Sequence, residues 1–152
     1  MAKPNARERD EFFDEHLPYE ISMLRFTFLE LQQPVAGPLG NVLIEAFCLH
    51  ARNLIEFFKN KDSCDFDPRE FTAAGHRLHK SFLPGALLMR INEQISHLTA
   101  NRTVISAEKI GPADRLRMFM AIEGEVTRFA SGLSLIYRPR WQLPLIVPRA
   151  QP

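Results

Sequence analysis

The chain lacks the signals that mark secreted, membrane-spanning and nucleic-acid-coating proteins. It contains only two cysteines, Cys48 and Cys64, and a disulfide between them is the minor alternative to two free thiols. No apolar run approaches the roughly 20 residues that span a bilayer, and the N-terminus has no apolar core of signal-peptide type. The formal net charge is +1, whereas strong non-specific DNA binding usually needs a net basic face. We therefore expect a cytoplasmic protein without a membrane partner or a strong DNA-binding surface.

Common catalytic and cofactor-binding motifs are also missing from the sequence. There is no glycine-rich phosphate loop, no Gly-x-Ser-x-Gly and no His-Glu-x-x-His. No carboxylate precedes any histidine by three residues, so the ligand pattern of di-iron helical bundles is absent as well. The sequence predicts no cofactor.

Apolar residues recur at three- and four-residue spacing along the chain, and strand-like alternation is lacking. This pattern predicts an all-α protein, a single domain spanning residues 1–152 with a bundle of about five helices. We expect an N-terminal arm or short helix within residues 1–17, and further helices at 19–32, 41–60, 69–80, 86–101 and 113–134. Prolines and glycines predict a loop at residues 34–40, with Asn41 as the N-cap of the next helix.

The helix expected at residues 41–60 is apolar around most of its circumference, which is typical of a helix surrounded by others. Two adjacent faces hold its apolar residues and one histidine: Leu43, Phe47, His50, Leu54 and Phe58 on the first, and Ile44, Cys48, Ala51 and Ile55 on the second. The remaining stripe is polar and consists of Glu45, Arg52, Glu56 and Lys59. This helix is predicted to form the centre of the bundle.

Residues 138–152 form a tail with four prolines, which exclude a regular helix. The tail also carries Trp141 and Leu143 and the apolar run at 145–147, and is too apolar for a solvated segment. It either packs back along the bundle or docks onto a partner chain. The second alternative makes a homodimer credible.

The cluster His50-Ala51-Arg52-Asn53 is the first candidate for chemistry. On one straight helix His50 and Arg52 lie about 200° apart, so they cannot serve one ligand together. The favoured interpretation makes His50 a core histidine with a hydrogen-bond partner on another helix. Arg52 is then one member of an ion pair with Glu56 or Glu45.

The second cluster lies on the helix predicted at 86–101. Its residues Arg90, Gln94, His97 and Asn101 fall within about 60° of one another. They form either a hydrogen-bonded network between helices or, with His50, a ligand pocket in which His97 does acid–base work and arginine contacts phosphate.

His76 and His79 are spaced like two metal ligands on a helix, and Cys64, Asp65 and Asp67 could add donors. No second pair of ligands with a defined spacing exists, so the sequence favours no metal at these weak candidates.

The Arg52-Asn53 pair in a buried helix, with His97 on a second helix, resembles the HEPN superfamily of small, often dimeric helical bundles, many of them metal-independent RNases. The resemblance implies catalytic roles for Arg52, Asn53 and His97. The superfamily's histidine follows the arginine by about four to six residues on the same helix, where this chain has Phe57, Phe58 and Lys59. The broken motif implies a non-catalytic member. The patterns HARNLIEFF and NEQISHLT also resemble those of bacterial helical proteins to which no activity is attached.

Three functions follow as hypotheses. The favoured one is a non-enzymatic helical interaction module that forms homodimers. The second is a HEPN-like RNA-binding protein or RNase of a toxin or antiphage system. The third is a small-molecule or metal sensor.

Overall fold

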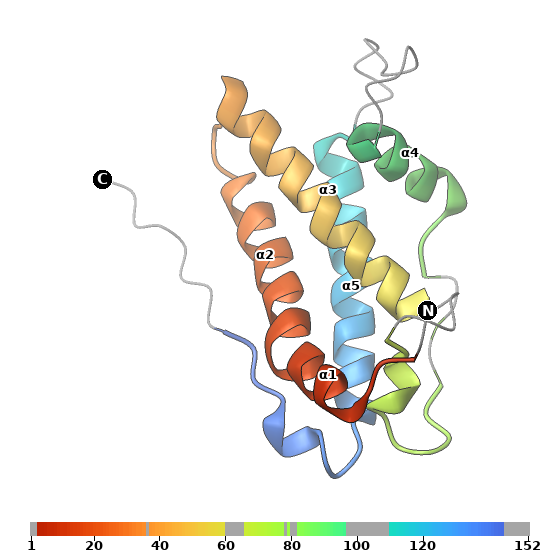
Figure 1. Cartoon of the computed structure of the whole chain (residues 1–152). Coiled ribbons are helices and arrows are strands. Elements are labelled where there is room, and N and C mark those ends of the chain that lie inside the picture. The colour runs from red at the N-terminus through yellow and green to blue at the C-terminus, as the bar shows by residue number, and fades with distance from the viewer. Residues whose placement is uncertain are drawn as a thin grey trace.

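The protein is an all-α bundle, as the sequence predicts (Figure 1). The computed structural model describes residues 3–35, 37–59, 66–77, 79, 82–96 and 110–144, with side chains of the fourth helix described as far as Ile91. Its helices are α1 (Ala6–Glu11), α2 (Leu17–Glu30), α3 (Gly37–Lys59), α4 (Gly85–Ser96) and α5 (Pro112–Gly132). In the described part of the chain no helix is long and apolar enough to cross a membrane.

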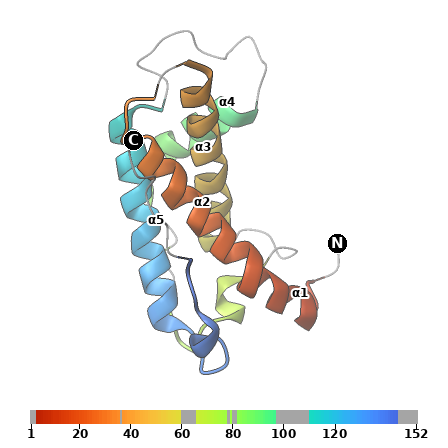
Figure 2. The ribbon, with the colours of Figure 1, turned by 90° about the vertical axis from the view of Figure 1, so that its left-hand side faces the viewer.

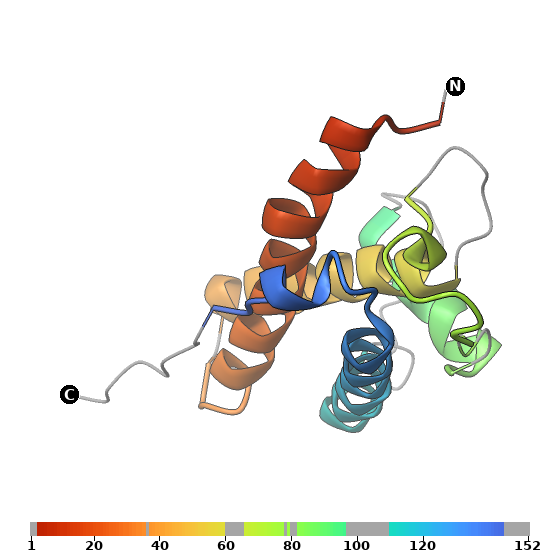
Figure 3. The same cartoon turned by 90° about the horizontal axis from the view of Figure 1, so that it is seen from below.

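The arrangement places α3 across the front of α5 and beside α2 (Figure 1). Seen from the side, α1 continues the line of α2, and α5 runs along the left edge of the view (Figure 2). Seen from below, α3 runs between α2 and α4 (Figure 3). In this arrangement α3 packs against α2, α4 and α5.

The boundary predicted before Pro18 is replaced by a continuous helical rod from α1 through α2. A π-helical turn, Phe12–His16, joins the two helices, and the Leu17 N–H donates to the carbonyl of Phe12. A proline inside an α-helix clashes with the carbonyl four residues before it, and a widened turn relieves that clash. The described residues thus form four continuous helical rods rather than about five separate helices.

The start predicted for the central helix is also wrong. Instead of beginning after an Asn41 cap, α3 begins at Gly37, which has φ 67°. Pro38 is tolerated in this first turn because the N–H that it lacks has no helical partner there. Gly40 packs on the backbone of Val35, whose carbonyl oxygen would lie 3.1 Å from a Cβ at that position.

The helix predicted at residues 69–80 is absent from the described part of that segment, residues 69–77 and 79. Asp67 accepts from the Arg69 N–H as an N-cap, but only a 3₁₀ turn, Pro68–Glu70, follows. Phe71 then enters the core and is fully buried, and Thr72 forms an antiparallel bridge with Leu133 after α5. Tertiary contacts override the weak helical preference of this glycine-containing stretch.

The core confirms the two inner faces predicted for the central helix. Of those nine residues only Ile44 is partly exposed, and the other eight are buried: Leu43, Phe47, Cys48, His50, Ala51, Leu54, Ile55 and Phe58. Two bidentate ion pairs tie α5 to its neighbours. Arg25 of α2 donates to both oxygens of Glu123 at 2.7 and 2.8 Å, and Arg90 of α4 holds Asp114 with two bonds of 2.9 Å.

The first part of the C-terminal tail packs back onto the bundle. Trp141 lies 5.6 Å from Phe13 and 5.5 Å from Phe129 between ring centroids. Arg140 contacts Asp10 at 3.0 Å and Asp14 at 2.6 Å, and its guanidinium lies 5.1 Å from the centre of the Tyr137 ring. Residues 145–152 lie outside the described part of the chain, so whether they pack in cis or onto a partner stays a prediction.

Candidate functional site

A buried polar cluster joins α2 to α3. His50 Nδ1 lies 2.8 Å from Glu20 Oε2, and the Asn53 amide donates to the same oxygen at 3.2 Å. The His50 side chain is only 7% exposed, while the Tyr19 ring meets it edge-on at 5.7 Å. The partner that His50 requires from another helix is therefore Glu20. A carboxylate that accepts both donors satisfies the groups that burial would otherwise penalise.

Arg52 lies apart from this cluster, as the helical geometry predicts. Its Nε donates to Glu56 Oε1 at 2.8 Å along the exposed side of α3. The Asn53 amide donates instead to Glu20. The two residues of the HEPN-like dipeptide therefore bond to different glutamates. His97, the third proposed catalytic residue, lies outside the described residues. The structure therefore does not bring Arg52 and Asn53 together for one reaction, and the role of His97 stays a prediction.

The predicted cluster on the fourth helix is described only at Arg90. This guanidinium grips Asp114, whose carboxylate also accepts from the Gly111 N–H at 3.4 Å and so caps the start of α5. The Gln94 side chain, His97 and Asn101 fall outside what is described. For Arg90 the network between helices is the interpretation that the contacts bear out.

The two histidines proposed as metal ligands do not share a helix. The His76 imidazole covers Gly132 so closely that a Cβ there would lie 2.2 Å from Nδ1. His79 Nδ1 lies 3.8 Å from Glu125 Oε1, and its side chain is mostly exposed. Among the described residues no three His, Cys, Asp or Glu side chains gather closely enough to hold a metal. The helical spacing on which this candidate depended is therefore absent.

Cys48 is a free thiol in the core. Burial raises the pKa of this thiol to about 12. Since the thiolate is the reactive form, Cys48 serves packing rather than nucleophilic chemistry. Burial also lowers the pKa of Arg115, which lies in the same region and donates to the Ile110 carbonyl at 3.0 Å.

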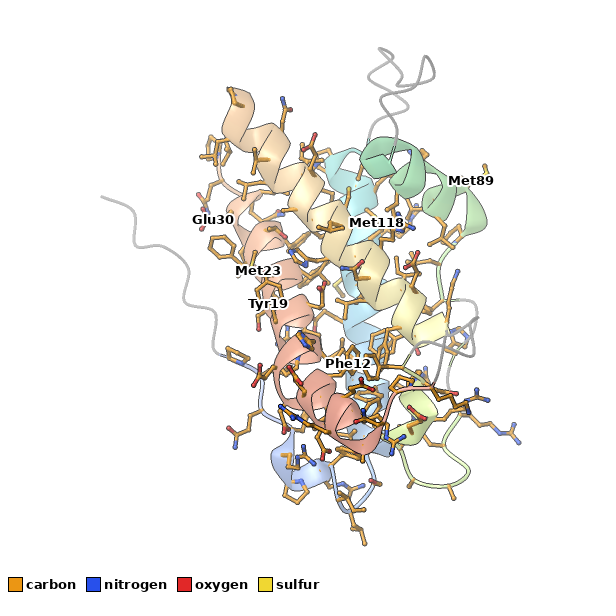
Figure 4. All side chains as sticks on the ribbon, viewed as in Figure 1. Phe12, Tyr19, Met23, Glu30, Met89 and Met118 are labelled. Carbon is orange, nitrogen blue, oxygen red and sulfur yellow. The ribbon has the colours of Figure 1, made fainter. Side chains whose placement is uncertain are left out.

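The outer face of α3 carries a feature that the sequence analysis missed. Two large apolar residues, Val42 and Leu49, lie among the charges of the predicted polar stripe and are 58% and 43% exposed. Tyr19 of α2 is 55% exposed and meets the His50 ring edge-on, on the flank of α3 that faces α2. Figure 4 shows it beside Met23 on α2. The signal was available, because Val42 and Leu49 are seven residues apart and fit neither inner face.

We call Val42, Glu45, Leu49 and Arg52 the outer face of α3. Large apolar side chains that are exposed as a group mark surfaces for association. Glu45 and Arg52 place one charge of each sign on this face.

Comparison of the chain with protein-family models, with curated proteins and with solved structures gave no match.

Proposed function

We propose that this protein is a non-enzymatic helical interaction module that forms homodimers through the outer face of α3. The observation that carries the proposal is the exposure of Val42 and Leu49 on α3, the helix whose two inner faces close the core. Each exposed aliphatic side chain leaves apolar area in water that association would remove, at about 25 cal/mol per Å².

The contacts of the candidate catalytic residues support the same conclusion. Glu20 holds both His50 and Asn53, while Arg52 donates to Glu56. Each of these contacts stabilises the bundle or its surface. They give the helix that carries the outer face a fixed position, and a preorganised surface loses less entropy on binding.

The test is the mass of the protein in solution across a concentration series. We expect light scattering to show a dimer for the wild type, and a monomer for Leu49→Asp at the same concentration. Leu116→Asp is the matched control, because Leu116 is a leucine of similar exposure on a different helix, α5. Circular dichroism checks that each variant remains helical.

A wild type that stays monomeric at the highest concentration would contradict the proposal, as would equal loss of dimer in Leu49→Asp and Leu116→Asp. Cleavage of RNA by the wild type, lost in His97→Ala, would instead favour the RNase hypothesis.

A further inference from the structure

The outer face presents its side chains in an order that is complementary to itself. Along α3, Val42 is followed by Glu45, Leu49 and Arg52, and Tyr19 lies beside the helix at the level of His50. At about 100° per residue these four α3 residues fall within about 80° of one another. They therefore form one ridge with an acid before Leu49 and a base after it.

When two copies of α3 pack antiparallel, the acidic position of each copy faces the basic position of the other. If a second α3 lies antiparallel with Leu49 on the twofold axis, Glu45 stands four residues before the axis and Arg52 three residues after it. Glu45 of one copy then lies opposite Arg52 of the other, and the pair occurs twice. A parallel arrangement would instead put each residue at the level of its own copy and bring like charges together.

The apolar residues fit the same axis. Leu49 meets Leu49 of the second copy, and Tyr19 of each copy lies on the opposite flank from the charges. An apolar centre with charges at the edge is the usual anatomy of a protein interface. The ion pair of Arg52 with Glu56 remains possible, because a guanidinium has five donors.

We infer that the partner of the outer face is a second copy of this chain, bound antiparallel about a twofold axis at Leu49 with reciprocal Glu45–Arg52 pairs. The inference rests on the proposed function and specifies its geometry. The face is smaller than the roughly 20–30 residues a side of a standard interface, so the dimer is expected to be weak and dependent on concentration.

Cysteine cross-linking tests the axis. In a Cys64→Ser background, Leu49→Cys is expected to form a covalent dimer under mild oxidation, because the two thiols meet at the axis. The control Val42→Cys lies seven residues away, so its two copies are about 20 Å apart along the helix and should cross-link at least tenfold less. The native Cys48 remains in both proteins, since its burial keeps it out of the reaction.

Charge exchange tests the pairing. We expect Glu45→Arg to weaken dimerisation by about fivefold to tenfold, and the double variant Glu45→Arg with Arg52→Glu to restore it. Within one chain the two positions are about 10 Å apart along the helix, so rescue reports a contact between copies.

The outcomes separate the two proposals. A dimer that Leu49→Asp dissociates, but that neither cross-links through Leu49→Cys nor shows charge rescue, overturns the antiparallel geometry and leaves the interaction module standing. A monomer at every concentration overturns both.

Discussion

The inner and outer faces of α3 carry similar residues in different surroundings. Phe47 and Leu54 on the inner face are enclosed by the bundle, whereas Val42 and Leu49 on the outer face are exposed. The charged groups differ in the same way: Glu20 supports buried donors, and Glu56 pairs with Arg52 at the surface. The comparison teaches that residue type alone does not separate a core side chain from a surface one on this helix, because that depends on which neighbouring helices cover it.

The largest expected difference in the free energy of unfolding is between a substitution at the buried Phe47 and one at the exposed Leu49. Phe47→Ala should lower the free energy of unfolding by about 3–5 kcal/mol, because it leaves a cavity in a close-packed core. Leu49→Ala should change it by about 0.5 kcal/mol or less. Urea unfolding measures both, at a protein concentration where the chain is monomeric. Equal losses would mean that the outer face is part of the fold's own core.

A smaller difference in the free energy of unfolding is expected between substitutions at Glu20 and at Glu56. Glu20→Ala removes the acceptor of His50 and Asn53 and should cost about 1–3 kcal/mol, since those donors are left in a poorly solvated site. Glu56→Ala breaks an exposed pair of residues four apart, which is worth about 0.2–0.5 kcal/mol. Urea unfolding again gives the difference. A Glu20→Ala cost no greater than that of Glu56→Ala would show that the buried cluster adds no stability.

A third effect, which grows with pH, concerns Cys48, the buried neighbour of Leu49. Because burial raises the pKa of Cys48 to about 12, the unfolded chain loses this proton first as pH rises. The contribution of Cys48 to stability is complete below about pH 8.5 and declines above it, by at most about 1.4 kcal/mol per pH unit. Cys48→Ala should therefore flatten the alkaline decline of stability measured by urea unfolding between pH 8 and pH 10.

The same pair can be compared by alkylation. With Cys64→Ser as the background, iodoacetamide at pH 8 should modify Leu49→Cys readily and leave Cys48 intact, as read by mass spectrometry. Rapid modification of Cys48 in the folded protein would contradict the burial of the inner face.

The sequence predicted the long helices and the inner faces of α3 because apolar periodicity is a local property that packing then reinforces. It also predicted that His50 and Arg52 diverge, since that follows from 3.6 residues per turn alone. It did not predict that Asn41 lies inside α3 or that residues 71–77 leave the helical path. Phe71 illustrates the reason, because its burial against distant residues outweighs the preferences of its neighbours.

The identity of contacts between helices was likewise beyond the sequence. Nothing in the pattern singles out Glu20 as the partner of His50, or Asp114 as the partner of Arg90, because each pair joins residues far apart in the chain. The exposed ridge was missed for a related reason. In the sequence, Val42 and Leu49 look like two more core residues of a helix that is buried on all sides. Only the positions of α2, α4 and α5 show that none of these helices covers them.

The sequence by itself determined that the chain is helical, that α3 is its centre and which of its faces are apolar, since these depend on spacing along one helix. Tertiary structure alone decided which apolar residues remained in water and which polar groups met. Those outcomes depend on where separate helices come to rest, and they make the outer face of α3 the surface on which the function is proposed.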